Sequence, residues 1–300
     1  MAHHLGDALP HPIAFVFSGG ANLGAVQAGM LRALRDAGIQ PDLIVGSSVG
    51  ALNGGLVANH GLEQGVALLE RIWRNIRRED VFPGNVWSQA LCLIRSRLHL
   101  FPNDKLAELI CSSLTVDTFD ELLLPFGAVA TDLESQQGVL FNCGHLEPAL
   151  LASTAIPGLF PPIEIDGKRY IDGGFTANVP LHAALMMGAA SIVVLDVNST
   201  CEPRRQPRTI VDMILTMIQS GLRRRAEIEV PMIAAFTPVI YLPAPCLEHG
   251  QVLDFEGSSA LLDQAAQVAS EFLASCPVPA PGLMVGALHH HTDELVCVTV

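Results

Sequence analysis

The sequence predicts an α/β protein in which helices cover a parallel β-sheet. The apolar run Ile13–Phe17 ends in Ser-Gly-Gly and is followed by a helical pattern over residues 23–37. The arrangement then repeats, because the apolar residues 43–46 lead into Gly-Ser-Ser-Val-Gly and a second helical pattern over residues 51–59. Two successive strand–turn–helix units at this spacing are typical of parallel strands, since a helix must carry the chain back before the next strand begins.

The alternation of strands and helices continues along most of the chain. An amphipathic helix is predicted over residues 63–78, with Val66, Leu69 and Trp73 on its apolar face. Residues 80–103 follow no clear pattern and are expected to be a connection. The other predicted helices cover residues 104–114, 146–153, 180 onward, 209–225 and 258–274, and the other predicted strands cover residues 126–131, 138–142, 169–171, 191–196 and 239–242.

One main domain is expected, because no internal repeat and no linker divides the chain. It covers residues 13–274, preceded by an N-terminal extension over residues 1–12. Residues 275–300 are expected to be a Pro-rich C-terminal tail outside the ordered core.

The composition excludes several classes of protein. With 300 residues, 50% of them apolar and 16% charged, the chain is neither disordered nor fibrous. Its net charge of -13 would repel a phosphate backbone, so we expect no nucleic acid as a partner. The longest uncharged stretches are interrupted by Gly, Pro and polar residues, and the first twelve residues lack the pattern of a secretory signal. A cytoplasmic location is therefore expected. The seven cysteines are odd in number and lack a C-x-x-C motif, which favours free thiols.

The Gly-Ser-Ser-Val-Gly segment is a candidate nucleophile elbow. Glycines at positions 46 and 50 would let the chain turn sharply from strand to helix and expose the Ser48 hydroxyl above a helix N-terminus. The G-x-S-x-G pattern also occurs in ordinary Gly-rich turns, where Ser48 would only cap the helix. The assignment of Gly46, Ser48 and Gly50 to a nucleophile elbow therefore depends on other motifs in the chain.

The preceding Gly-rich turn could supply hydrogen-bond donors for an oxyanion. Backbone N–H groups of Gly19, Gly20 and Ala21 precede a predicted helix, and no bulky side chain blocks their approach to a carbonyl oxygen. A nucleotide-phosphate loop is the alternative. It is disfavoured because Ala21 stands where G-x-G-x-x-G needs glycine, and because the segment contains no lysine.

A third motif, Asp172-Gly173-Gly174, ends a predicted strand. Its carboxylate could accept a proton from Ser48 if both lie at the same edge of the sheet. An aspartate that begins a turn often bonds only its own backbone, so the combination of the three motifs carries the prediction.

In combination these segments resemble the patatin-like phospholipase family. The resemblance rests on SGGANLGAVQAGMLRAL, GSSVGALNGG and ASTAIPGLFPPIEIDGKRYIDGGFTANVP, in this order, and covers about residues 13–274. It implies a three-layer α/β/α sandwich with a mostly parallel central sheet, and a serine acyl hydrolase that uses a Ser-Asp dyad and no cofactor or metal. It implies Ser48 as nucleophile, Asp172 as its proton acceptor and a lipid ester, phospholipid or lysophospholipid, as substrate.

Two positions depart from the family pattern. The family commonly has a third glycine where this chain has Ala21, and an Arg or Lys where it has Leu23. Alanine supplies an N–H group but adopts a positive φ at a cost, which could reshape the oxyanion loop. Leu23 removes a cation that could contact a head group. The alternative function is therefore a catalytically weak or inactive scaffold on the same fold.

Other residues of the chain could take part in the same chemistry or bind a metal. His182 is the nearest histidine in sequence for a Ser-His-Asp triad, but only one strand precedes the elbow, which favours the dyad. Asp132 is expected to stabilise a turn. Three consecutive histidines, residues 289–291, are expected to be solvated rather than metal-binding.

A basic cluster surrounds the helix predicted over residues 209–225. It could dock on an anionic membrane, with Met213, Ile214 and Met217 entering the interface. A core-facing helix with a solvated basic rim is the alternative, and the sequence leaves the oligomeric state open. The cluster consists of Arg204, Arg205, Arg208, Arg223, Arg224 and Arg225.

Overall fold

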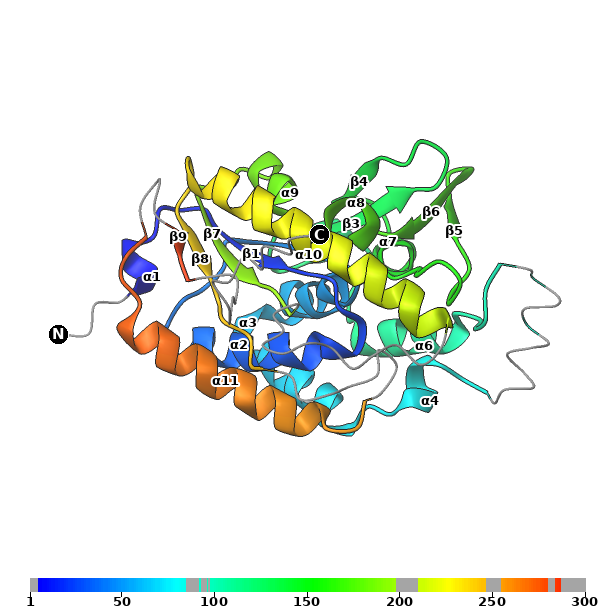
Figure 1. Cartoon of the computed structure of the whole chain (residues 1–300), viewed down its shortest axis with the longest axis horizontal. Coiled ribbons are helices and arrows are strands. Elements are labelled where there is room, and N and C mark those ends of the chain that lie inside the picture. The colour runs from blue at the N-terminus through cyan, green and yellow to red at the C-terminus, as the bar shows by residue number, and fades with distance from the viewer. Residues whose placement is uncertain are drawn as a thin grey trace, which may run out of the picture.

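The computed structural model describes residues 5–84, 92, 96, 98–197, 210–246, 255–279 and 284–286. Within these residues a nine-stranded sheet forms the middle layer (Figure 1), in the order β5-β6-β3-β2-β1-β7-β8-β9, with β4 paired to β3. The pairings from β3 to β9 along this order are parallel, whereas β4, β5 and β6 pair antiparallel. The predicted mostly parallel α/β sheet is confirmed. The strands are β1 (Ile13–Phe17), β2 (Leu43–Ser47), β3 (Phe126–Asp132), β4 (Gly138–Phe141), β5 (Ile163–Ile165), β6 (Lys168–Asp172), β7 (Ser191–Leu195), β8 (Val239–Tyr241) and β9 (Met284–Val285).

Helices cover both faces of the sheet (Figure 1). Helices α2, α3 and α11 lie on one face, and α9 and α10 lie on the other. The described helices are α1 (Leu5–Ala8), α2 (Gly24–Asp36), α3 (Val49–Asn75), α4 (Arg78–Val81), α6 (Asp104–Ser113), α7 (Leu146–Ser153), α8 (Gly174–Ala177), α9 (Leu181–Met186), α10 (Ile210–Ala234) and α11 (Ser258–Ser275).

The central strands are apolar throughout because they are covered on both sides. In β1, Phe15 and Phe17 pack in the cluster beneath α2 and α3, while Ala14 and Val16 pack beneath α9 and α10. All five residues of β1 are buried, as the continuous apolar run predicts for a parallel strand in the middle of a sandwich.

The two helices predicted over residues 51–59 and 63–78 are confirmed as the two halves of α3. The element runs from Val49 to Asn75 and is interrupted at Gly61, whose φ of 75° and ψ of 165° are not helical. Glycine adopts this positive φ at little cost, so the chain changes direction there. The predicted apolar face of the second half is confirmed, because Val66, Leu69 and Trp73 are buried.

Several short elements, including α8, lie where no element was predicted. Helix α1 lies in the predicted N-terminal extension, and both Leu5 and Leu9 are buried in the core. Strand β9 lies in the predicted tail and pairs parallel with β8. Strand β5 pairs antiparallel with β6. Two- and three-residue strands are too short to show a hydrophobic period, which is why the sequence pattern missed β5 and β9.

The expectation of free thiols is wrong for Cys246, which is disulfide-bonded. Cys92, Cys111, Cys143 and Cys276 are free. Sequence spacing detects local motifs such as C-x-x-C, so the absence of that motif does not exclude a disulfide.

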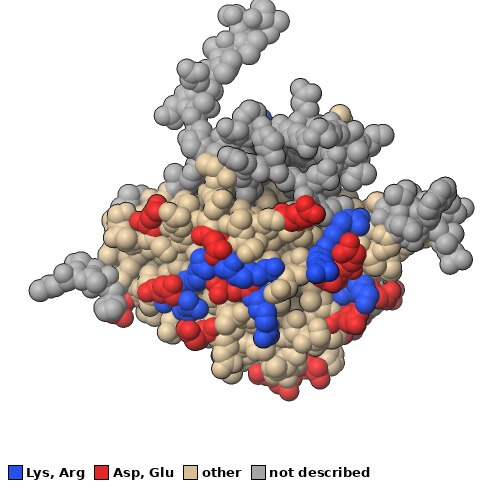
Figure 2. Space-filling view, turned by 90° about the horizontal axis from the view of Figure 1, so that it is seen from below, with Lys and Arg blue, Asp and Glu red and all other residues tan. Residues whose placement is uncertain are grey.

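Ion pairs attach α11 to the two helices beneath it. Arg32 of α2 contacts Glu70 and Asp263 at 3.0 and 3.1 Å, and Arg74 of α3 contacts Asp263 at 2.6 Å. Figure 2 looks onto this side of the molecule and shows basic and acidic side chains interleaved rather than separated. Among the described helices, none is both long and apolar enough to cross a bilayer.

Candidate active site

Ser48 occupies a sharp turn between β2 and α3. Strand β2 ends at Ser47 and helix α3 begins at Val49, so Ser48 alone makes the turn, with φ 55° and ψ -128°. A left-handed φ at a residue other than glycine costs free energy and persists only where the surroundings impose it. The turn also needs glycine at position 50, because an added Cβ there would lie 2.5 Å from the Ser18 carbonyl oxygen. The local geometry is that of a nucleophile elbow.

The Ser48 hydroxyl contacts Asp172 across strand β3. In the sheet register, Ser47 pairs with Val129 and Asp172 pairs with the next residue, Ala130. The antiparallel strand β6 therefore ends level with β2. Ser48 Oγ donates a hydrogen bond to Asp172 Oδ2 at 2.5 Å, and the two residues are only 6% and 4% exposed. Residues 124 positions apart thus form one buried pair.

The Asp172 carboxylate lies in an environment that favours its neutral form. Burial raises its pKa from 3.8 to about 6, although hydrogen bonds from Ser48 and from the Gly174 N–H oppose the shift. The Gly174 N–H donates to Asp172 Oδ1 at 2.7 Å. Glycine is required at position 173, where an added Cβ would lie 2.0 Å from the Val129 carbonyl oxygen. A carboxylate with this pKa is ionised at neutral pH and still close enough to its pKa to exchange a proton.

The glycine loop, residues 18–24, lies beside Ser48. An added Cβ on Gly19 would be 3.1 Å from Ser48 Cβ. The Gly19 N–H already donates to the Asn178 carbonyl oxygen at 3.0 Å. Among the described residues, no acceptor takes the N–H groups of Gly20 and Ala21. Of the three predicted oxyanion donors, Gly20 and Ala21 thus have N–H groups to offer, and Gly19 has its N–H in use.

Both departures from the family pattern have a structural counterpart. Ala21 adopts a φ of 51°, the left-handed conformation that glycine adopts without strain. Leu23 is half-buried and packs against the apolar core. The chain therefore keeps the loop geometry and uses position 23 for packing.

Ser153 supports Ser48 and was assigned no role from sequence. Its Oγ accepts the Ser48 N–H at 3.0 Å and donates to the Val129 carbonyl oxygen at 2.6 Å. Ser153 ends helix α7 and is fully buried. Its only signal was its place in the segment ASTAIPG, which spacing alone could not connect with Ser48.

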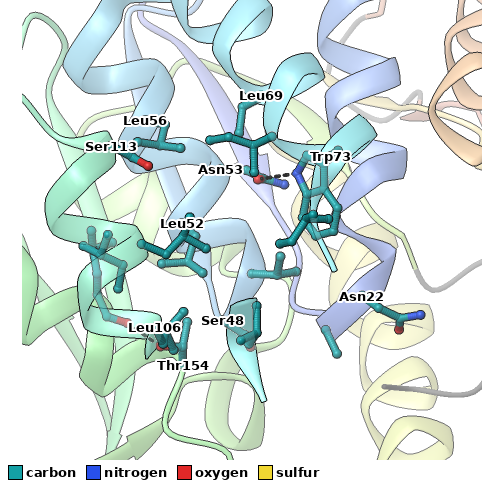
Figure 3. A pocket seen from close by; sticks show the side chains of 18 of the residues that line it. Asn22, Ser48, Leu52, Asn53, Leu56, Leu69, Trp73, Leu106, Ser113 and Thr154 are labelled. Atoms are coloured by element: carbon teal, nitrogen blue, oxygen red, sulfur yellow. Dashed lines mark hydrogen bonds between the residues drawn. The ribbon is translucent and has the colours of Figure 1, made fainter. Parts of the chain in front are cut away.

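An apolar pocket opens beside Ser48 (Figure 3). It has an empty volume of about 860 Å³, open solvent included. Leu52 and Leu56 from the first half of α3 and Leu69 from the second half lie on its walls, and Phe160 also lines it. The polar side chains on its wall are Asn22, Ser48, Asn53, Trp73, Ser113 and Thr154. A long apolar chain could fill this pocket with its polar end at Ser48.

Several other predictions have definite outcomes. Asp132 is confirmed as a turn residue, because its Oδ1 accepts the N–H groups of Glu134 and Ser135 at 3.0 and 2.9 Å. His182 is exposed on α9. The region described contains no group of three His, Cys, Asp or Glu side chains placed to hold a metal ion. The described side chains of the basic cluster, Arg224 and Arg225, are exposed on α10, and the histidines at 289–291 lie outside the described residues.

The fold and the elbow define an α/β protein that presents a serine, paired to a buried aspartate, beside a Gly-rich loop. The sequence profile described as "Patatin-like phospholipase" matches residues 15–185. The chain belongs to the patatin-like phospholipase family.

Curated relatives share this region. The chain is 30% identical over 192 residues to the rat patatin-like phospholipase domain-containing protein 7, which covers 63% of this chain and 14% of the relative. It is 28% identical over 218 residues to an uncharacterized NTE family protein of Mycobacterium tuberculosis, 72% of this chain and 58% of the relative. It is 27% identical over 187 residues to the lysophospholipase NTE1 of Mycosarcoma maydis, 62% of this chain and 10% of the relative. The chain thus spans about a seventh of the length of the rat protein.

Solved structures with a similar arrangement include VipD from Legionella pneumophila. The TM-score is 0.45 at 14% identity, over 87% of this chain and 67% of VipD. Human GIVD cytosolic phospholipase A2 gives a TM-score of 0.43 at 13% identity, over 89% of this chain and 59% of that chain.

Proposed function

We propose that the protein is a serine acyl hydrolase that cleaves carboxylic ester bonds of lipids. The observation that carries the proposal is the hydrogen bond from Ser48 Oγ to Asp172 Oδ2 at 2.5 Å, at the wall of an apolar pocket. A hydroxyl activated by a carboxylate attacks acyl carbonyls, and an apolar pocket beside it accommodates the acyl chain. The family description favours phospholipid substrates, and the name of the Mycosarcoma maydis relative favours lysophospholipid substrates.

In the first half-reaction Asp172 takes the proton of Ser48 while Oγ attacks the ester carbonyl carbon. The C=O electron pair moves to oxygen, and the N–H groups of Gly20 and Ala21 stabilise this oxyanion. The N-terminus of the first half of α3 adds a favourable dipole next to Ser48. When the oxyanion collapses, the C–O bond of the ester breaks, and the leaving alkoxide takes the proton from Asp172. An acyl-Ser48 ester remains.

The second half-reaction returns the enzyme to its starting state. Asp172 takes a proton from water, the resulting hydroxide attacks the acyl-Ser48 carbonyl, and the same N–H groups stabilise the second oxyanion. Collapse releases the fatty acid, and Ser48 Oγ recovers its proton from Asp172. The reaction needs no group beyond these residues and water.

Two neighbouring serines test the assignment with one matched pair of variants. Ser48→Ala should abolish hydrolysis of a short-chain chromogenic ester and labelling by a serine-directed fluorophosphonate. Ser47→Ala should keep both, because the buried Ser47 Oγ has no hydrogen-bond partner among the described residues and its removal costs no bond there. Circular dichroism controls for folding. Hydrolysis by Ser48→Ala at the wild-type rate would refute the proposal.

A scaffold without activity is the second candidate, and Leu23 favours it because the family commonly has a cation there. The fluorophosphonate separates the two. Labelling that depends on Ser48 supports the enzyme, whereas a folded wild-type protein that is neither labelled nor active supports the scaffold.

We also propose that helix α10 contacts an anionic lipid surface. Met213, Met217, Ile228 and Met232 are 56–67% exposed and fall on one side of the helix at 100° per residue, with Arg224 among them. On the inner side, Leu222 Cδ1 lies 3.8 Å from the position of a Cβ on Gly174, next to Asp172. The exposed apolar side therefore lies across the helix from the proposed active site.

Vesicle co-sedimentation tests the membrane contact. Binding should increase with the fraction of anionic lipid and fall in the double variant Met217→Ser, Arg224→Glu. Leu123→Ser is the control, because Leu123 is equally exposed, at 67%, in a segment far along the chain from α10. Binding that ignores anionic lipid, or that both variants reduce equally, would contradict the contact.

A further inference from the structure

Three buried polar side chains form a continuous chain of hydrogen bonds behind the glycine loop. Gln27 lies on α2, whereas Asn53 and Trp73 lie on the two halves of α3, and they are 0%, 2% and 5% exposed. Trp73 Nε1 donates to Asn53 Oδ1 at 3.0 Å, and Asn53 Nδ2 donates to Gln27 Oε1 at 2.8 Å. Burial of polar groups in an apolar layer costs free energy unless they are hydrogen-bonded. Three such groups in one cluster therefore indicate a specific role.

Every N–H donor of these three side chains has an acceptor. Gln27 Nε2 donates to the carbonyl oxygens of Ser18 and Leu195 at 2.8 and 3.2 Å. The second hydrogen of Asn53 Nδ2 goes to the Gly24 carbonyl oxygen at 3.0 Å. With two donors on each amide and one on the indole, the donor count is complete. A complete network in an apolar surrounding holds a single geometry.

Two of the three carbonyl groups on which the network ends bound the glycine loop. Ser18 begins the loop and Gly24 ends it, and between them lie the N–H groups of Gly20 and Ala21, which have no acceptor in the part of the chain that the structure describes. Fixing both ends of so short a loop fixes the direction in which those N–H groups point. Donors aimed in advance at a developing oxyanion lower the barrier because they need no reorganisation during the reaction.

The same network reaches the acyl pocket. Asn53 and Trp73 line the pocket together with Ser48, and Figure 3 shows their hydrogen bond on the pocket wall. The indole of Trp73 also supports the loop directly, because an added Cβ on Gly24 would lie 2.3 Å from its Cζ2. Trp73 therefore contacts both the space for the acyl chain and the end of the loop.

We propose that Gln27 and Asn53 are positioning residues that aim the N–H groups of Gly20 and Ala21 at the oxyanion, and that Trp73 orients the Asn53 amide. The inference rests on the proposed hydrolase activity. None of the three side chains needs to touch the reacting atoms, and each acts through the loop.

Two asparagines on the same helix provide the test. Asn53→Leu removes the amide that holds Gly24, and kcat should fall about 10- to 100-fold with KM changed less than about threefold, since the defect lies in the transition state. Asn59→Leu is the matched control. Asn59 is also buried on α3, at 4% exposure, but its amide bonds Thr115 and not the glycine loop. Its kcat should stay within about twofold of wild type.

Milder variants keep the inference falsifiable if Asn53→Leu folds poorly. Trp73→Phe keeps an aromatic wall and removes the N–H together with one ring of the indole that supports Gly24, so kcat should fall several-fold with little change in KM. Gln27→Met removes the contact with Ser18 from the other helix, and its effect combined with Trp73→Phe should be less than additive, because both act through one network.

The outcomes separate this inference from the proposed function. If the wild-type protein hydrolyses esters through Ser48 while folded Asn53 and Trp73 variants keep the wild-type kcat, or lose activity through KM alone, the positioning role is wrong and the hydrolase assignment stands. Equal losses of kcat in Asn53→Leu and Asn59→Leu would also overturn it. A folded wild type without esterase activity would overturn both proposals.

Discussion

The turns that follow β1 and β2 contain similarly strained residues, but only one of these residues needs its side chain. Each contains a single non-glycine residue with a left-handed backbone, Ala21 at φ 51° and Ser48 at φ 55°. Ser48 must carry its side chain, because the hydroxyl bonds Asp172. Ala21 contributes only its N–H, which glycine would supply equally well. Strain is thus unavoidable in the second turn and removable in the first.

Replacing Asp172 should have the largest effect on activity, because the turn after β2 presents the Ser48 hydroxyl to this carboxylate. Asp172→Asn keeps the shape and removes the base, so kcat should fall at least about 10³-fold. Since burial raises the pKa of Asp172 to about 6, the ionised group destabilises the folded wild type at neutral pH. A shift of about two units from 3.8 corresponds to about 3 kcal/mol, so the variant should be more stable by up to that amount.

Urea unfolding measured at several pH values checks the predicted effect of Asp172 on stability. The folded pKa lies above the unfolded value, so the folded state binds the proton more tightly, and the stability of the wild type should fall as the pH rises from about 4 to about 6. Asp172→Asn should lack this fall. A variant less stable than wild type at pH 7 would show that the carboxylate is not buried as described.

Replacing Gly50, which lies where the two turns touch, should give the next largest effect. In Gly50→Ala the new Cβ would lie 2.5 Å from the Ser18 carbonyl oxygen and push the turns apart. We expect a loss of about 1–3 kcal/mol in the free energy of unfolding and a marked fall in kcat, because both the nucleophile and its oxyanion donors move. Normal stability and activity would mean that the turns are independent.

A change of pH should have a smaller effect on turnover than these substitutions. The effect should depend on Asp172, which contacts the turn that carries Ser48. Ionised Asp172 is the proposed base, so kcat/KM should fall about tenfold per pH unit below about 6 and level off above it. Hydrolysis of a chromogenic ester with a pH-independent leaving group measures this profile. An acid limb far from pH 6 would assign the base to another group.

Removing the strain in the first turn should have the smallest effect. Ala21→Gly keeps the N–H and relieves the left-handed alanine, which costs about 1 kcal/mol, in part offset by the greater freedom of glycine in the unfolded chain. The free energy of unfolding should rise by up to about 1 kcal/mol with kcat unchanged or higher. A destabilised Ala21→Gly would show that the alanine methyl contributes packing.

Sequence reasoning selected Ser48 and Asp172, the residues of the proposed active site, because short-range sequence signals mark the segments that carry them. Glycines beside Ser48 and after Asp172 indicate tight turns, and an apolar run such as β1 indicates a buried parallel strand. Ser153 and the Asn178 carbonyl that takes the Gly19 N–H were missed, since both act through contacts with segments far away in sequence. Strand β9 was missed for a different reason, because two residues are too few to show a hydrophobic period.

The break at Gly61 divides α3 into two halves with different structural roles. The half of α3 before Gly61 packs against β2 and begins directly after Ser48, whereas the half after Gly61 supplies Leu69, Ile72 and Trp73 to the pocket wall. Adding or deleting residues at Gly61 would shift the second half relative to the first and change the volume of the pocket. In a lipid hydrolase of the proposed kind, selectivity for acyl-chain length can therefore change at a position remote from Ser48.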